Sequence, residues 1–340
     1  MTAHVKPDAS HSALPFQPEH EMFRTMARRF LETECVPHRD AWEEAGMAPR
    51  SAWKRAGELG LLCFRQPEAY GGQGADILFS VALMEEQVRT GVVGPMLSLH
   101  NDVVAPYVEL YGDEAQKARV LPRMAAGDWI GAIAMTEPGG GSDLRGMTTR
   151  AVRDGDDYVI TGHKTFISNG ACADLIVLAA KTETGISLFL VETPDLAGFA
   201  HGEPLEKLGQ WSADTTELFF DGARIPASSL LGGVEGRGFA QLMARLVEER
   251  LMTAVGAVAT METALAHTIA YTSERKAFGQ RVIDFQNSRF RLAECQTEAV
   301  VCRTYLERCL LKFVGGRLTP EEAAMLKLAT TDKQNQIVDA

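Results

Sequence analysis

The first 127 residues carry hydrophobic positions at helical spacing and no alternating strand pattern. In the first helix, Phe23, Met26 and Phe30 recur three or four positions apart, a spacing that puts them on one face. Further helices are expected over residues 51–59, 77–89, 97–111 and 113–126, the last with Asp113 as its N-cap. We therefore expect an N-terminal all-α domain over residues 1–127, because the strand–helix alternation of a nucleotide-binding βαβ fold is missing.

The pattern changes at Gly127, after which short β-like runs replace the helices. The turn Asp154-Gly155-Asp156 joins two of these runs and predicts a hairpin. The runs cover residues 129–135, 147–153, 158–161, 164–168, 175–180, 188–192 and 216–220. We expect a middle β domain over residues 128–236 that forms a sheet or a small barrel.

The last hundred residues return to a helical pattern. A helix is expected from Phe239 to about Lys276, where proline is absent, and a second helix carries three cysteines seven positions apart. Thr319-Pro320-Glu321-Glu322 is a capping box with proline in the first turn, so it predicts a third helix. The fold class is therefore α+β, with a C-terminal helical bundle over residues 237–340. The chain ends within a predicted helix at Ala340, which favours a truncated sequence.

Composition and charge exclude several classes of protein. The formal charge of −11 leaves no basic excess for a nucleic-acid partner. The six cysteines contain no C-x-x-C pair, so the sequence predicts no metal site and no redox pair. No apolar run is long enough to span a membrane, and residues 1–15 resemble neither a secretory signal nor an Arg-rich presequence. A cytoplasmic location is expected.

The stretch from Ala134 to Asp143 contains three consecutive glycines between Thr136-Glu137-Pro138 and Ser142-Asp143. Glycine allows backbone N–H groups to approach a ligand closely, and the flanking hydroxyls add donors. A simple glycine-rich turn leading into the β region is the alternative interpretation. A phosphate-binding loop of a nucleotide-binding fold is excluded, because no helix is predicted to follow the glycines.

This stretch and several later motifs together resemble the acyl-coenzyme A dehydrogenases, over nearly the whole chain. The order of the motifs makes the resemblance specific, and the Phe-Ile-Ser version at residues 166–168 looks like the long-chain branch, since many relatives have Trp and Thr there. The matching segments are Thr136 to Asp143, Lys164 to Gly170, Asp214 to Phe220, Arg224-Ile225-Pro226, Glu249-Arg250-Leu251, Arg275 to Gln280, and Phe285-Gln286.

The resemblance implies FAD as cofactor and assigns it residues from two parts of the chain. It implies that Met135 and Thr136 face the flavin ring, that Phe166 covers one face of it, and that Ser168 lies near its reactive nitrogen. Arg275, Phe278 and Gln286 would reach the FAD of a neighbouring subunit. The implied cofactor-binding residues are Met135, Thr136, Gly141, Ser142, Phe166, Ile167, Ser168, Arg275, Phe278 and Gln286, and the implied substrate-binding residues are Ser142 and Arg250.

The reaction that the resemblance implies needs a carboxylate that removes a proton from Cα of a thioester. Relatives place this base in one of two positions, and Glu249 matches the one on the long third-section helix. Glu249 is spaced from Leu242 and Leu246 so that the three share a face, whereas Glu248 is expected to face water. A burial-raised pKa would suit such a base. The alternative is that Glu249 is an ordinary surface glutamate.

The implied function is α,β-desaturation of a medium- to long-chain acyl-CoA in fatty acid β-oxidation, with electrons passed to an electron-transferring flavoprotein. A homo-oligomer, a dimer or a homotetramer, is implied. One alternative is a flavin oxidase or monooxygenase on the same fold. Another is a non-catalytic acyl-CoA-binding subunit, because relatives continue past the equivalent of Ala340 with glycines that hold a partner's FAD. His100, near the implied acyl pocket, is expected to be a hydrogen-bonded helix residue.

Overall fold

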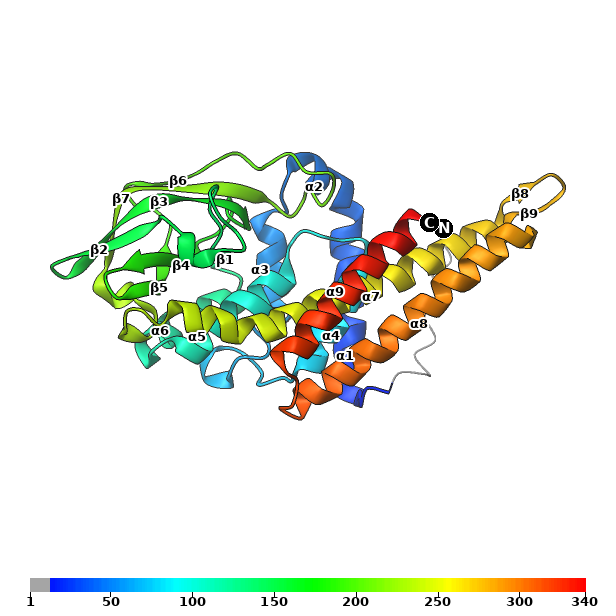
Figure 1. The fold of residues 1–340 in the computed structure, drawn as a ribbon, viewed down its shortest axis with the longest axis horizontal. Helices are drawn as coiled ribbons and strands as arrows, with labels where there is room; N and C mark the ends of the chain where they lie inside the picture. Colours follow the sequence, from blue (N-terminus) through cyan, green and yellow to red (C-terminus); the bar gives the residue numbers. More distant parts are fainter. Residues whose placement is uncertain (1–12) are drawn as a thin grey trace. The chain divides into compact units, whose positions relative to one another are not determined.

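The computed structural model describes residues 13–340, and the chain in it divides into two compact units (Figure 1). The helical unit contains residues 13–28, 77–91 and 246–340. The mixed unit contains residues 29–76 and 92–245. The predicted class, helices flanking a central sheet, is confirmed.

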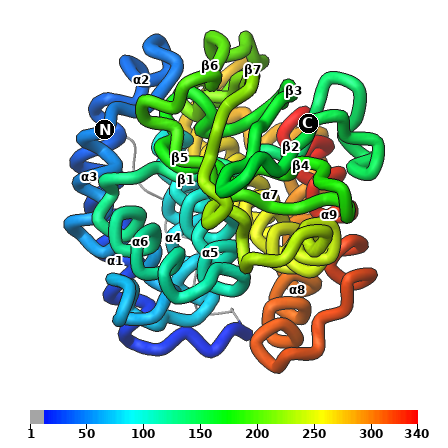
Figure 2. The backbone as a smooth tube through the Cα atoms, turned by 90° about the vertical axis from the view of Figure 1, so that its left-hand side faces the viewer, coloured from blue at the N-terminus to red at the C-terminus, as the bar shows by residue number. Residues whose placement is uncertain are grey.

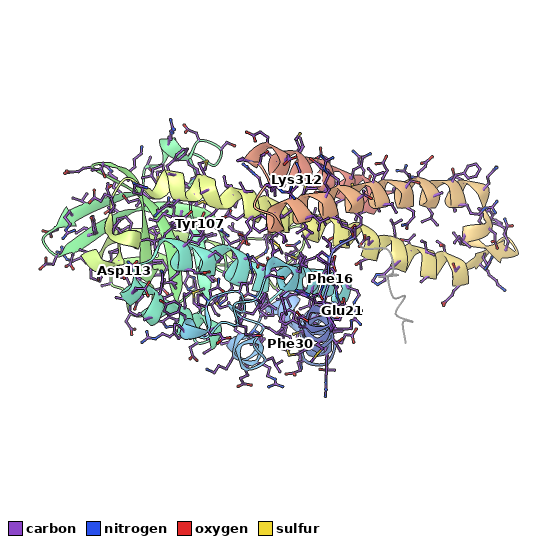
Figure 3. The ribbon with its side chains drawn as sticks, turned by 90° about the horizontal axis from the view of Figure 1, so that it is seen from below. Phe16, Glu21, Phe30, Tyr107, Asp113 and Lys312 are labelled. Carbon is purple, nitrogen blue, oxygen red and sulfur yellow. The ribbon has the colours of Figure 1, made fainter. Side chains whose placement is uncertain are left out.

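The helical unit is built from long helices around one core. The core joins residues from all parts of this unit, among them Val81, Val258 and Leu306, each fully buried. The three cysteines at seven-residue spacing are buried in it as small apolar side chains. Lys312, labelled in Figure 3, pairs with Glu322 of the following helix. The helices are α1 (Pro18–Phe30), α4 (Ile77–Thr90), α7 (Gly238–Glu274), α8 (Gln286–Val314) and α9 (Pro320–Asp339); α1 and α7 cross the boundary between the units.

The mixed unit contains a seven-stranded sheet. Its order is β1-β4-β2-β3-β7-β6, and β5 pairs with β4. The β2–β3 pair is the hairpin that the turn at residues 154–156 predicts. The strands are β1 (Gly131–Ala134), β2 (Arg150–Asp154), β3 (Asp157–Ser168), β4 (Leu175–Thr182), β5 (Gly185–Glu192), β6 (Phe199–His201) and β7 (Thr215–Pro226).

Strands β4 and β5 are apolar on both faces, and this explains their continuous hydrophobic runs. Leu175 and Val177 of β4 belong to a cluster with residues of α5 and α6. Ile176 and Leu178, which point the other way, belong to a second cluster with residues of β3 and β7. The helices α5 and α6 therefore cover one face of β4 (Figure 2). The other face of β4 packs against residues of β3 and β7 from the same sheet.

The helices of the mixed unit are shorter. They are α2 (Arg39–Ala45), α3 (Arg50–Glu58), α5 (Ala105–Tyr111) and α6 (Glu114–Ala125). Asp113 forms the predicted cap, accepting a hydrogen bond from the Gln116 amide in a full capping box. Figure 3 labels Asp113 and Tyr107 of α5. Short turns of other helix types cover Leu31–Cys35 and Leu99–Val104 (π), and Val36–His38, Glu68–Tyr70, Leu144–Gly146, Ala227–Ser229, Leu231–Gly233 and Val282–Asp284 (3-10).

Several predicted elements differ from the observed ones. The runs over 158–161 and 164–168 are one strand, β3, because a bulge interrupts its pairing without ending it. The helix expected over 97–111 begins as a π-helical turn before α5, since Pro106 has no N–H to donate. Strand β6 and the small hairpin of β8 (Lys276–Ala277) and β9 (Gln280–Arg281) were not predicted, because such short strands show no periodicity. No helix in the described part of the chain could cross a membrane.

Candidate functional site

Two backbone segments of the mixed unit meet where the sequence predicts the flavin ring. The first is Met135-Thr136-Glu137, which follows β1 and which we call the strap. The second is the bulge of β3 around Thr165 and Phe166. The Thr165 N–H donates to the Thr136 carbonyl at 3.0 Å, and the Thr136 hydroxyl donates to the Thr165 carbonyl at 2.5 Å. These reciprocal bonds hold the strap and the bulge side by side. The Thr136 hydroxyl proton is used in one of them, so this hydroxyl does not donate to a ligand at the same time.

The bulge turns Phe166 outward. The pairing of β3 with β7 shifts register between Lys164 and Ile167, and Phe166 takes a φ of +58°. A phenylalanine rarely adopts this left-handed conformation, so the surrounding structure must enforce it. Phe166 is 70% exposed, whereas Ile167 is buried in the sheet and Ser168 is half-buried. An exposed aromatic face held in a strained backbone suits stacking on a planar ligand.

A buried ion pair lies behind the strap. The Lys164 ammonium donates to Glu137 Oε1 at 2.9 Å and to the Met135 carbonyl at 3.0 Å. Burial alone would raise the pKa of Glu137, but hydrogen bonds from Thr149 and Thr148 and from Lys164 outweigh it and lower that pKa to about 2. Burial lowers the pKa of Lys164, and Glu137 opposes this shift. The pair was not among the predicted site residues, although both lie within motifs that carry the resemblance.

The glycines beyond the strap leave the site open. Glu137 and Gly140 exchange two backbone hydrogen bonds of 3.0 Å and close a tight turn. A Cβ at Gly139 would meet no atom within 4 Å, and one at Gly141 would make only an ordinary contact. Ser142 is exposed beside them. Open backbone, a half-buried hydroxyl at Ser168 and an exposed aromatic ring together fit a flavin, the cofactor that the sequence implies.

The structure corrects the prediction for Glu248 and leaves that for Glu249 as a prediction. Glu248 is only 4% exposed and does not face water, while Glu249 is half-buried. The spacing from Leu242 did not identify a single buried face, because α7 is buried on several sides, with Leu251 and Val255 fully enclosed. Burial therefore does not distinguish Glu248 from Glu249 as the catalytic base. Only Glu249 matches the Glu249-Arg250-Leu251 motif.

The remaining predicted residues lie in the helical unit. Arg250 is half-buried on α7, and Arg275 and Gln286 are exposed. Phe278 is 97% exposed at the tip of the β8–β9 hairpin, with a φ of +52°. The structure does not bring these residues together with the strap in a described contact. Their roles stay predictions.

His100 is confirmed as a hydrogen-bonded residue. It is fully buried in the mixed unit, where its Nδ1 accepts from the Gly131 N–H at 3.1 Å. Its Nε2 then donates to the Met124 carbonyl at 3.2 Å, which fixes a neutral tautomer. Burial lowers its pKa to about 4. The imidazole therefore holds the start of β1 in place.

Comparison with protein families gives three consecutive matches. Residues 17–128 match the N-terminal domain of acyl-CoA dehydrogenase, residues 132–223 its middle domain, and residues 236–340 its C-terminal domain. Together they cover most of the chain, in the order that the sequence motifs predict.

Individual relatives agree with the family models. The chain is 42% identical to the mitochondrial long-chain specific acyl-CoA dehydrogenase of Mus musculus, over 95% of this chain and 76% of the mouse protein. It is similar to the crystal structure of an acyl-CoA dehydrogenase from Geobacillus kaustophilus, with a TM-score of 0.93, 45% identity, and coverage of 96% and 87% of the two chains. A glutaryl-CoA dehydrogenase from Mycobacterium smegmatis in complex with FADH2 matches with a TM-score of 0.88 and 31% identity, over 95% and 83%.

Proposed function

Because this chain belongs to the acyl-CoA dehydrogenase family, whose members are FAD-dependent oxidoreductases acting on CH–CH bonds, we propose that it introduces a double bond between Cα and Cβ of an acyl-CoA thioester. The observation that carries the proposal is the exposed Phe166 ring, held beside the strap and the open glycines. Such a surface has an aromatic wall and backbone donors at one place.

FAD, when bound, would supply the acceptor for the hydride that leaves Cβ of the substrate. The chain itself must remove the Cα proton, and Glu249 is the residue proposed for this step. Met135 and Thr136 would support the ring from the strap, and Phe166 and Ser168 from the bulge. Gly141 and Ile167 would complete the FAD site. The Ser142 hydroxyl would lie near both the flavin and the CoA phosphates, and Arg250 would contact the substrate.

The test compares two neighbouring carboxylates of α7. Glu249→Gln should bind FAD normally and lose at least a hundredfold in the rate at which an acyl-CoA bleaches the flavin, because the proton acceptor is gone. Glu248→Gln is the matched control, since it removes a more buried carboxylate one position away and should retain that rate. A wild-type protein without bound flavin would refute the proposal as a whole. A rate unaffected by Glu249→Gln would refute the assigned base.

A medium- to long-chain acyl group is the proposed substrate class. The support is the identity to the long-chain specific enzyme, while the glutaryl-CoA dehydrogenase shows that other acyl groups occur among similar proteins. An electron-transferring flavoprotein is the proposed acceptor in fatty acid β-oxidation, and a cytoplasmic location is proposed with it. The rate of flavin bleaching can be measured with a panel of acyl-CoAs from about four to sixteen carbons, and it ranks them as substrates. Rapid reoxidation of the reduced flavin by O₂ would instead support an oxidase.

A homo-oligomer is proposed from the apolar side chains that the helical unit exposes. Monomeric proteins rarely expose many large apolar side chains together. The fully exposed Phe278 at a hairpin tip also suits contact with a second subunit. Light scattering gives the mass directly, and a monomer at micromolar concentration would refute this part. The exposed side chains on α8 and α9 are Phe290, Val300, Val301, Leu311, Val314, Met325, Leu328 and Val338.

A further inference from the structure

We propose that Lys164 and Glu137 are the positioning residues of the cofactor site, setting the spacing of strap and bulge before FAD binds. The inference rests on the proposed function, because it assigns the cofactor to these two segments. Neither side chain is predicted to touch FAD. Both act through the backbone that carries the contacting residues.

Lys164 and its neighbour Thr165 connect the bulge to three consecutive residues of the strap. Lys164 lies in β3, two residues before Phe166, and its side chain is fully buried. Its ammonium donates to the Met135 carbonyl and to the Glu137 carboxylate, the residues on either side of Thr136. Thr136 is bonded to Thr165 in turn. Every residue of the strap is therefore tied to the strand that carries the bulge.

The carboxylate extends the connection to a third segment. Besides Lys164, Glu137 accepts from the Thr148 N–H at 2.6 Å, the Thr148 hydroxyl at 2.7 Å and the Thr149 N–H at 3.0 Å. Thr148 and Thr149 lie just before β2. The chain between Glu137 and Thr148 contains the open glycines, so this carboxylate closes the loop at its base. Glu137 thus fixes both ends of the loop that presents Gly141 and Ser142.

Position and burial support this role over a general one in folding. A buried charge pair is at best a weak source of net stability, whereas its geometric demands are strict. This pair joins loop backbone to a bulge, where the regular ladder of the sheet is interrupted and cannot define the spacing itself. It also fixes the strand two residues before Phe166, which has a left-handed conformation.

The test is the affinity of the apoprotein for FAD, measured by quenching of flavin fluorescence. Lys164→Met removes the ammonium but keeps a long side chain, and it should raise the dissociation constant at least tenfold. Arg224→Gln is the matched control. This substitution breaks an ion pair with Asp154 in the same sheet, in which both side chains are more than half exposed. It should change the dissociation constant for FAD less than twofold. Amide hydrogen exchange of the apoprotein should speed up at Thr165 and Gly140 in Lys164→Met alone.

The outcomes separate the two proposals. If wild-type protein binds no FAD, the proposed function fails. If wild type binds FAD and Lys164→Met binds it equally well with unchanged exchange, the positioning inference fails while the function stands. Should Lys164→Met not fold, Glu137→Gln serves, because it keeps the side-chain size but places an amide against the Thr148 N–H. Failure of both variants to fold would assign the pair to the whole fold and overturn the inference.

Discussion

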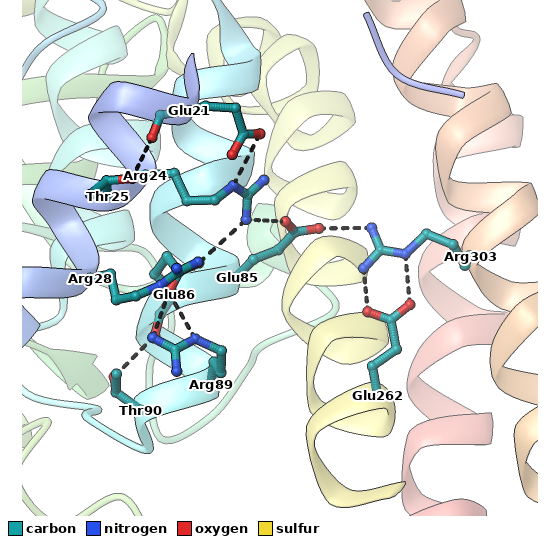
Figure 4. Close-up of polar contacts among 10 residues, drawn as sticks. All are labelled: Glu21, Arg24, Thr25, Arg28, Glu85, Glu86, Arg89, Thr90, Glu262 and Arg303. Carbon is teal, nitrogen blue, oxygen red and sulfur yellow. Dashed lines mark hydrogen bonds and ion pairs between the residues drawn. The ribbon is translucent and has the colours of Figure 1, made fainter. Parts of the chain in front are cut away.

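Charged side chains are paired differently in the two units. In the mixed unit, Lys164 and Glu137 form a single pair in which each residue is the other's one charged partner within 4 Å among the described ion pairs. In the helical unit, arginines and glutamates from α1, α4, α7 and α8 alternate in a connected network (Figure 4). Glu85, for example, contacts both Arg24 and Arg303 at 2.8 Å.

The difference concerns how a lost charge is compensated. Glu86 lies within 4 Å of Arg24, Arg28 and Arg89. Burial would raise the pKa of Glu86, but Arg28 and Arg89 outweigh it and lower that pKa. Removing one arginine leaves others in place. The Lys164–Glu137 pair has no second charged partner among the described ion pairs. Its remaining hydrogen bonds go to backbone and hydroxyl groups. A network suits helix packing, whereas a single pair suits a site where one geometry is needed.

The largest expected effect comes from breaking the single pair. Glu137→Leu leaves the Lys164 ammonium buried without its carboxylate and should reduce the free energy of unfolding by about 3–5 kcal/mol. Urea titration of the apoprotein, followed by circular dichroism, measures this loss. A loss below that of Arg303→Met would show that the single pair is no more vulnerable than the network.

Acid should affect the mixed unit through His100. Its pKa is near 6.5 when unfolded and about 4 when folded, so the folded state resists protonation. Stability should therefore be unaffected above pH 6.5 and fall by about 3 kcal/mol as the pH drops to 4. Urea titrations at several pH values measure the slope. His100→Asn, which keeps an acceptor for the Gly131 amide, should be less stable at pH 7 but lack this acid-dependent loss; an unchanged slope would contradict the assignment.

A smaller effect is expected in the network. Arg303→Met removes contacts to Glu262 and Glu85, but Glu85 keeps Arg24 and Glu262 is about one-third exposed to water. We expect a loss of about 1–2 kcal/mol in the free energy of unfolding, because neither carboxylate is left enclosed and alone. The double variant Arg24→Met/Arg303→Met should lose more than the sum of the single variants, since Glu85 then loses both contacts. Strict additivity would show that the network is not coupled.

The smallest effect is expected at an exposed pair. Arg281, the last residue of β9, pairs with Asp284 at 2.9 Å, and both side chains are exposed to water. Arg281→Gln should leave the melting temperature unchanged, because solvent screens exposed charges. Differential scanning calorimetry provides the measurement. A clear drop would mean that this surface is covered in the assembled protein, which would support the proposed oligomer.

The sequence predicts the elements of this fold better than the interactions between them. The β2–β3 hairpin and the N-cap at Asp113 are local features, and both are confirmed. The bulge at Phe166 is not local, because it depends on the register of β3 against β7. Burial of Glu248 depends on what packs around α7, so helical spacing alone gave the wrong face. The Lys164–Glu137 pair joins residues 27 positions apart, and no pattern along the chain marks it.

Substitutions at Gly139 can measure how closely the glycine loop approaches the bound cofactor. Its backbone is not left-handed, and apart from Gly139 and its two chain neighbours no protein atom lies within 4 Å of where a Cβ would stand. A small side chain at this position would therefore not meet the rest of the chain at its Cβ, so a limit on it there comes from the molecule that binds. In a series from alanine through valine to phenylalanine, the first side chain that weakens FAD binding without lowering the melting temperature reports the clearance between loop and cofactor.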